Sequence, residues 1–124
     1  MFSRIMYVTV LVSDHDKALD FYTSSFGFQK RADYSGPEGR FLTIALGNQG
    51  FEVLLWLVKA GQAKASPGVA TLFIESDDLR KDFAQLKARG VRFLEPDPET
   101  YPFGMRVTAL DPDGNPVALR QTRK

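Results

Sequence analysis

The stretch VTVLVSDHDKALDFYTSSFGF, Val8–Phe28, combines the signals of a strand and of a helix. Its β-branched beginning predicts a strand over Ile5–Val12. Ser13 is suited to cap a helix, and two aspartates in the turn after it would favour the positive end of the helix dipole. Apolar residues then recur at helical spacing until Gly27, where we expect the helix to end.

The same order of signals returns in LFIESDDLRKDFAQLKARGVRF, Leu72–Phe93, where we expect a strand over Val69–Glu75 and a helix that ends at Gly90. Similar residues stand 64 positions apart in the two copies, as Asp14 and Asp78 do. Further pairs at this offset are Leu19 with Phe83, Tyr22 with Leu86, Ala45 with Ala109, Leu46 with Leu110, Gly50 with Gly114, and Leu55 with Leu119.

This repeat predicts two βαβββ modules, about 1–60 and about 67–122, within a single domain of residues 1–124. The remaining strands are expected over Arg40–Leu46, Phe51–Val58, Val91–Leu94, Met105–Leu110 and Val117–Gln121. We interpret Tyr34–Arg40 as a flexible loop that could act as a lid, and Glu95–Phe103 as a loop broken by prolines. The segment DPDGN that precedes the last strand reads as a tight turn.

Composition excludes several classes of partner and site. The 124 residues include 16 Lys and Arg against 15 Asp and Glu, a net charge of +1, so nothing indicates nucleic acid or a membrane surface as a partner. The absence of cysteine excludes disulfides, thiolate nucleophiles and zinc–sulfur sites. The longest apolar run, around Val53–Val58, is too short to cross a bilayer, and Met1–Arg4 leads into a strand without a secretory signal. We therefore expect a cytoplasmic protein.

The two strand–helix stretches, together with the closing DPDGNPVAL of Asp111–Leu119, resemble the vicinal oxygen chelate superfamily. That superfamily contains glyoxalase I, bleomycin-resistance proteins and extradiol dioxygenases. The resemblance runs from about Ile5 to about Gln121. It implies an α+β fold in which two βαβββ modules form a curled mixed sheet around a cleft, usually in a homodimer. Such folds carry several chemistries, so the resemblance does not by itself assign a function.

In metal-dependent members of the superfamily, four residues of the cleft, usually His or Glu, bind the metal. The first-strand ligand stands seven residues before the Asp of the helix cap, and the last-strand ligand is the Glu of a D-G-N-x-x-E-L pattern. The resemblance and the repeat offset place these positions at Tyr7, Leu54, Thr71 and Ala118. None of these side chains is a good ligand for a divalent cation. The resemblance thus implies a lost metal site and no cofactor.

Glu52 is the one acid near these positions. Side chains two apart on a strand share a face, so a register shift of two would move Glu52 into the position of Leu54. A metal-dependent lyase or dioxygenase with a shifted ligand set that includes Glu52 is therefore the alternative function. Glu52 is also a weak candidate for the general base of a metal-free lyase or isomerase, or for a structural ion pair with Arg120.

Strand parity separates an aliphatic face from a mixed face. The aliphatic face, expected beneath the helices, carries Val8, Val10, Val12, Val53, Leu55, Leu57, Leu72, Ile74, Val117 and Leu119. The mixed face carries Tyr7, Thr9, Glu52, Leu54, Trp56, Thr71, Phe73, Ala118 and Arg120, all but Thr9 of which are candidate ligand-binding residues. Apolar walls with a few polar groups are typical of sites for organic ligands.

Two more candidates lie in a loop at the expected mouth of the cleft. Phe103 and Arg106 could close over a ligand, or Phe103 could cap the core while Arg106 is solvated. His15, the only histidine, falls in the first turn of the predicted helix, where we expect a solvated surface side chain. We therefore expect a homodimeric binding protein for a small organic ligand.

Overall fold

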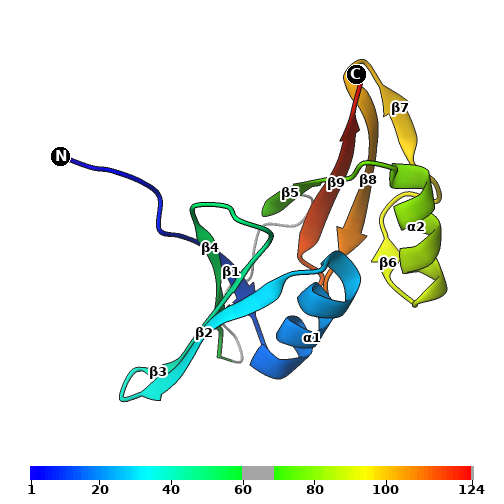
Figure 1. Cartoon of the computed structure of the whole chain (residues 1–124). Helices are drawn as coiled ribbons and strands as arrows, with labels where there is room; N and C mark the ends of the chain where they lie inside the picture. Colours follow the sequence, from blue (N-terminus) through cyan, green and yellow to red (C-terminus); the bar gives the residue numbers. More distant parts are fainter. Residues whose placement is uncertain (60–68, 124) are drawn as a thin grey trace. The chain divides into compact units, whose positions relative to one another are not determined.

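The computed structural model describes residues 1–59 and 69–123. By its internal contacts the chain divides into two compact units, Met1–Ala65 and Ser66–Lys124. Figure 1 shows a helix and strands in each unit. The two sheets are both mixed and both small, so the α+β class predicted from the sequence is confirmed.

The first unit has the predicted βαβββ order. Its elements are β1 (Tyr7–Val12), α1 (His15–Phe26), β2 (Gln29–Gly36), β3 (Gly39–Ala45) and β4 (Glu52–Leu57). The strands lie in the order β1-β4-β3-β2, with β1 parallel to β4 and the other pairs antiparallel. The first and last strands of the module are therefore neighbours, although a helix and two strands separate them in sequence.

The second unit repeats this order with one strand added. Its elements are β5 (Leu72–Glu75), α2 (Leu79–Ala88), β6 (Arg92–Phe93), β7 (Glu99–Tyr101), β8 (Gly104–Leu110) and β9 (Pro116–Thr122). The sheet order is β5-β9-β8-β6, and β7 also pairs with β8. The prediction of a loop over Glu95–Phe103 is wrong, because β7 lies within it. The prolines of this segment flank the short strand, so they remove no donor from its ladder.

Both helices begin at an aspartate. The Asp14 carboxylate accepts a hydrogen bond from the Lys17 backbone N–H at 3.0 Å, and Asp78 does the same for Lys81 at 3.2 Å. The prediction that Ser13 caps α1 is wrong by one residue. A carboxylate at the N-cap both accepts from the first turn and interacts with the positive end of the helix dipole.

Strand register supports the internal repeat. In the first unit Thr9 lies beside Leu54, and in the second unit Phe73 lies beside Ala118. Both members of the second pair stand 64 residues after their counterparts, which is the predicted offset. The first and last strands of the two modules are therefore equivalent residue by residue.

The offset differs in the middle strands. Ile44 lies beside Val53 in the first unit, whereas Ala109 lies beside Val117 in the second, so β3 and β8 are related by the 65 residues between Ile44 and Ala109. The predicted pairs Ala45 with Ala109 and Leu46 with Leu110 are wrong by one residue. The segments that connect each helix to these strands differ in length, and the offset changes accordingly.

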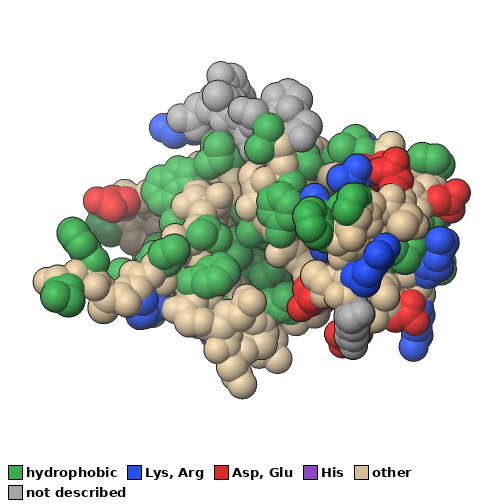
Figure 2. All heavy atoms as spheres, turned by 90° about the horizontal axis from the view of Figure 1, so that it is seen from above, with side chains coloured by type: hydrophobic (Ala, Val, Ile, Leu, Met, Phe, Trp, Pro, Cys, Tyr) green, Lys and Arg blue, Asp and Glu red, His purple; other side chains and the backbone are tan. Residues whose placement is uncertain are grey.

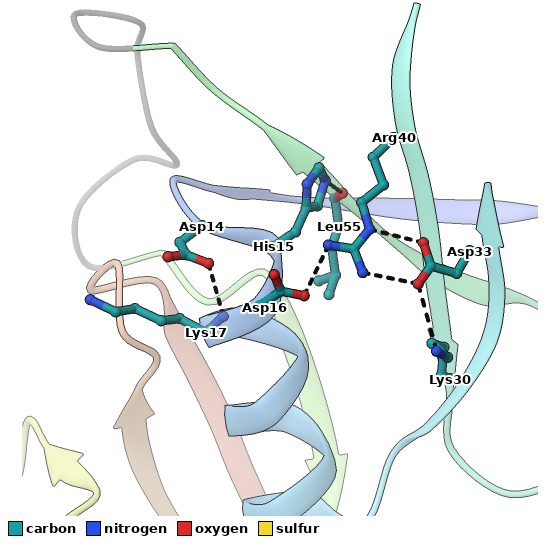
Figure 3. Close-up of polar contacts among 8 residues, drawn as sticks. All are labelled: Asp14, His15, Asp16, Lys17, Lys30, Asp33, Arg40 and Leu55. Carbon is teal, nitrogen blue, oxygen red and sulfur yellow. Dashed lines mark hydrogen bonds and ion pairs between the residues drawn. The ribbon is translucent and has the colours of Figure 1, made fainter. Parts of the chain in front are cut away.

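The segment Tyr34–Arg40 is the end of a β-hairpin, so the prediction of a loop there is wrong. Tyr34 pairs with Phe41, and Ser35 pairs with Arg40. Gly39, with φ of 113°, allows the tight connection between β2 and β3. Arg40 further ties the hairpin to α1, because its guanidinium binds both Asp33 on β2 and Asp16 on α1 (Figure 3).

The aliphatic face of each sheet forms the core of its unit. The buried strand residues of this face are Val10, Val12, Leu42, Ile44, Val53 and Leu55 in the first unit and Val107, Ala109, Val117 and Leu119 in the second. Ala18 and Tyr22 of α1 are buried as well, as are three apolar residues of α2. Burial of one face leaves the mixed face of each sheet without a helix of its own unit.

The DPDGN segment is a closed hydrogen-bonded turn between β8 and β9. Asp111 and Asn115 are almost fully buried, at 1% and 2% exposure. The Asp111 carboxylate accepts from the backbone N–H groups of Asp113 and Asn115 and from the Asn115 amide, at 2.8 to 2.9 Å. Asp111 and Asn115 of the motif therefore have a structural role, which is to stabilise the turn. Among the described residues, neither helix is long and apolar enough to cross a membrane.

Candidate functional site

The mixed face of the first sheet presents aromatic rings. Tyr7 and Trp56 keep 38% and 45% of their surface exposed. The Tyr7 and Phe41 rings are nearly perpendicular, with their centroids 5.5 Å apart. The Tyr34 ring stacks on the Phe41 ring at a centroid distance of 5.9 Å. Sequence analysis did not identify Phe41, although it stands two residues from Thr43 on β3 and therefore shares its face.

Glu52 lies on the same face and has a fixed partner. The buried Thr43 hydroxyl donates to Glu52 Oε1 at 2.7 Å, and the Thr43 oxygen in turn accepts from the Ala32 N–H at 3.1 Å. Glu52 and Tyr7 lie side by side in the β1–β4 register and line a pocket of about 330 Å³. The half-buried Leu54 and the exposed Thr9 form the next pair along the two strands. The Glu52 carboxylate is thus positioned beside a ring and a pocket.

The mixed face of the second sheet is built around Arg120. Its guanidinium carbon lies 5.1 Å from the Phe73 ring centroid and 5.2 Å from that of Tyr101. Arg106, directly opposite Arg120 in the β8–β9 register, lies 4.9 Å from the same Tyr101 ring. In Figure 2, charged side chains gather on the side of the view where α2 and β7 lie.

A second carboxylate reaches this face from the segment before β7. Glu95 accepts from the Thr108 backbone N–H at 2.7 Å and from the Thr108 hydroxyl at 3.1 Å. Thr108 is the cross-strand neighbour of Ala118, as Thr43 is of Leu54. Sequence analysis missed Glu95. The equivalence of Thr43 and Thr108 would have pointed to it, but that equivalence is known only from the strand register.

The four positions of the family's metal ligands do not fit a divalent cation. In the first unit Tyr7 and Leu54 offer one phenol and no carboxylate or imidazole. In the second unit Ala118 is buried with only a methyl group, and the Thr71 N–H and hydroxyl are both directed to the Pro116 carbonyl oxygen. Over residues 1–59 and 69–123, no three His, Cys, Asp or Glu residues come together as a metal site would need.

The register assigns Glu52 to the position next to Tyr7 rather than to that of Leu54. By the repeat, Leu54 corresponds to Ala118, and Glu52 corresponds to Pro116. The shifted ligand set that would include Glu52 therefore has no counterpart in the second unit.

The expectation of a solvated His15 is wrong. His15 is only 8% exposed, and its Nε2 lies 2.9 Å from the Leu55 carbonyl oxygen on β4 (Figure 3). A carbonyl oxygen accepts, so the Nε2–H donates. His15 is buried because the first turn of α1 packs against β4, and its hydrogen bond ties the helix to the sheet.

The two loop candidates lie beside the Arg120 cluster. Phe103 is 72% exposed, and its ring meets the Tyr101 ring at a centroid distance of 5.8 Å. Arg106 is exposed and lies 3.6 Å from Glu99. Phe103 therefore does not cap the core, and Arg106 is part of a charged and aromatic cluster on the mixed face.

Comparison with known proteins gives concordant results. The family model of the Glyoxalase/Bleomycin resistance protein/Dioxygenase superfamily matches residues 4–119. An uncharacterized protein of Bacillus subtilis (strain 168), YetH, is 32% identical over 123 residues, which cover 98% of this chain and 100% of the relative. Among solved structures, TnmS3, an antibiotic binding protein from Streptomyces sp. CB03234, is 33% identical with a TM-score of 0.82 and 98% coverage of both chains. A superfamily member from Sphaerobacter thermophilus DSM 20745 is 32% identical with a TM-score of 0.82, covering 97% of this chain and 98% of its own.

Proposed function

We propose, since this chain belongs to the Glyoxalase/Bleomycin resistance protein/Dioxygenase superfamily, that it is a member without a metal site that binds a small organic ligand. The proposed ligand-binding residues are those of the two mixed faces, with Tyr7 and Trp56 as the principal aromatic contacts. A homodimer and a cytoplasmic location belong to the same proposal.

The observation that carries the proposal is made on the mixed face of the first sheet, where side chains that are poor metal ligands occur together with exposed aromatic side chains. The metal-ligand positions hold Tyr7 and Leu54, and the same face carries two exposed aromatic side chains, Tyr7 itself and Trp56. Exposed aromatic groups next to a few oriented polar groups are typical of binding surfaces for organic compounds. The hydrogen-bonded pair Thr43 and Glu52 supplies such polar groups.

The similarity to TnmS3 supports the same conclusion. That protein is described as antibiotic binding, and it covers nearly all of this chain at 33% identity. Binding without turnover requires ring surface and a few hydrogen-bonding groups rather than a metal centre. The mixed faces offer both of these.

The metal-free part is tested by elemental analysis of tag-free protein and by melting curves in added nickel, zinc, manganese and iron(II). We expect no stoichiometric metal and no rise in melting temperature, because no tightly bound cation would stabilise the native state. A stoichiometric metal together with a clear rise would contradict the proposal and would favour the metal-dependent lyase or dioxygenase alternative.

The binding part is tested by intrinsic fluorescence, because Trp56 is the single tryptophan of the chain. A panel of planar aromatic and antibiotic compounds is titrated, and any compound that quenches Trp56 is measured again by calorimetry. We expect Trp56→Ala and Tyr7→Ala each to weaken binding about tenfold, which corresponds to the loss of one aromatic contact.

The control for these variants is Leu57→Ala, which removes an apolar side chain that is as exposed as Trp56 but lies on the opposite face of β4. It should leave the affinity unchanged. Equal affinity for all three variants and the wild type would rule out this face as the binding surface.

A further inference from the structure

We infer that Arg120 recognises a planar oxyanion, in the first place a carboxylate, of the small organic ligand, on the mixed face of the second sheet. This inference rests on the proposed function and deepens it, because it assigns a chemical class to a ligand whose binding is itself proposed. Arg106, opposite Arg120 across the strands, would contribute to the same subsite.

The Arg120 guanidinium is held by aromatic rings. It lies over Phe73 at 5.1 Å and over Tyr101 at 5.2 Å, measured from the guanidinium carbon to the ring centroids. Phe73 is on β5 and Tyr101 on β7, so neighbours from two other strands position one side chain of β9. Contacts of this kind reduce the loss of side-chain freedom that binding by arginine otherwise costs.

The Nε–H donor of this guanidinium lacks an acceptor among the described residues. Arg120 Nε is buried and has no hydrogen-bond partner in the part of the chain that the structure describes. Within that part, no carboxylate oxygen lies within 4.0 Å of its nitrogens either. A buried donor without an acceptor is costly, and the cost is larger for a charged group.

The carboxylates of the same face are engaged elsewhere. Glu75, the β5 neighbour of Arg120, accepts from the Thr122 hydroxyl at 2.9 Å. Glu99 lies 3.6 Å from Arg106. Glu95 accepts from Thr108 through both oxygens. The face is therefore not basic as a whole, and among the described residues Arg120 has no acidic partner.

The opposition of Arg106 and Arg120 supports an anion between or beside them. Like charges that face each other across antiparallel strands destabilise the pair. A carboxylate would relieve this repulsion and would accept the two parallel N–H donors of a guanidinium edge. The aromatic contacts already engage the guanidinium through its π-system, so a planar ligand in the plane of its N–H groups would complete the site.

The test follows the Arg120 Nε–Hε signal by NMR while benzoate, and separately its neutral counterpart benzamide, is titrated into the full-length protein. We expect a saturable shift of this signal with benzoate and binding about tenfold weaker for benzamide, because only the carboxylate forms charge-assisted hydrogen bonds. Equal response to the two probes, or no saturable shift with benzoate, would overturn the inference.

Substitutions of Arg120 distinguish specific recognition of the carboxylate from unspecific electrostatic attraction of an anion. Arg120→Gln should abolish the preference for benzoate over benzamide, and Arg120→Lys should weaken benzoate binding about tenfold because lysine keeps the charge but lacks the planar fork. Arg123→Gln is the control, since it removes an exposed arginine outside the cluster. A benzoate affinity that falls as much in the control as in the Arg120 variants would show unspecific electrostatics and overturn the inference.

Two provisions keep the outcome interpretable. Thermal melting identifies any variant that does not fold, and the wild-type titration then decides by itself. The fluorescence assay on Trp56 judges the proposed function separately. A compound that binds there while benzoate leaves Arg120 unaffected would remove the oxyanion subsite and leave the proposed function standing.

Discussion

Arg40 binds two carboxylates from different elements. Its Nε and Nη2 donate to the two oxygens of Asp33 at 2.8 and 2.9 Å, and its Nη1 donates to Asp16 at 2.9 Å (Figure 3). The hydrogen bonds from Arg40 are the main reason why the pKa of Asp33 falls from 3.8 to about 2, with a smaller contribution from Lys30. The same contacts raise the pKa of Arg40 above its ordinary value.

This contact predicts a pH dependence. A carboxyl whose pKa is lowered in the folded state stabilises the fold above its unfolded pKa, and that contribution is lost as the pH falls through the folded pKa. For Asp33 the loss should therefore occur as the pH falls from near 4 to about 2. Carbon-13 titration of the Asp33 carboxyl should show the low pKa directly.

The variant Arg40→Gln should raise the pKa of Asp33 toward 3.8 and should remove part of the acid sensitivity of the free energy of unfolding. Arg31→Gln is a suitable control, because the Arg31 guanidinium donates to Gln29 and to the Gly47 carbonyl rather than to Asp33. If wild-type Asp33 titrated near 4, the bidentate contact would not exist in solution.

The burial of His15 could not be predicted from its position in the sequence. Its place in the first turn of a predicted helix indicated solvent, yet its ring donates to a strand carbonyl and is buried. The helix signal of the sequence specifies which residues are helical but not which side of the first turn meets the sheet. That side depends on how the helix packs, which is a tertiary property.

At the scale of elements, the β7–β8 hairpin depends on a glycine. Gly104 has φ of 145°, and a Cβ built there would overlap the Gln121 carbonyl oxygen on β9. The two backbones can approach this closely only without a side chain. Arg123 N–H then bonds the Phe103 carbonyl at 2.8 Å, so the turn is tied to the end of the chain.

We predict that Gly104→Ala lowers the free energy of unfolding by about 2 kcal/mol or more, through both the unfavourable φ and the overlap. Urea denaturation would measure the change. Gly36→Ala is the matched control in the other unit, because it has an ordinary φ and nothing within 4 Å of the added Cβ, and it should change stability by less than about 0.5 kcal/mol. Similar effects for both variants would show that the close approach at Gly104 is absent.

Strand β2 and strand β7 are the elements that sequence reasoning did not identify. Nearly every residue of β2 is exposed, so no apolar alternation marks it. Its hydrogen bonds to β3 hold it at the edge of the sheet, and edge strands need no buried face of their own. β7 is three residues long and pairs only with β8, so it is likewise specified by its partner.

At the scale of the whole molecule, the proposed homodimer predicts the molecular mass of the protein in solution. Light scattering should give about twice the 13.9 kDa of one chain. An apolar segment before β1 is a reason to expect association, since Ile5 and Met6 are 66% and 54% exposed and Phe2 is fully exposed. Exposed apolar patches commonly mark protein interfaces.

Replacing Phe2 and Ile5 together by serine should shift the protein toward the monomer if this segment is part of the interface. Val69→Ser removes an apolar side chain of similar exposure elsewhere and should leave the mass unchanged. A monomer at all concentrations in the wild type would contradict the proposed dimer.

The sequence by itself determined the family, the α+β class, both helices and most of the strands, because caps, glycine stops and apolar periodicity are local signals. Its repeat also predicted which residues of the first and last strands are equivalent, and the register confirms this. Only the tertiary structure decided that His15 is buried, that Glu95 and Glu52 each bind a threonine of a neighbouring strand, and that Arg120 lies over two rings without an acceptor. These contacts join residues far apart in the chain, and the register of the strands and the burial of side chains set them rather than local propensity.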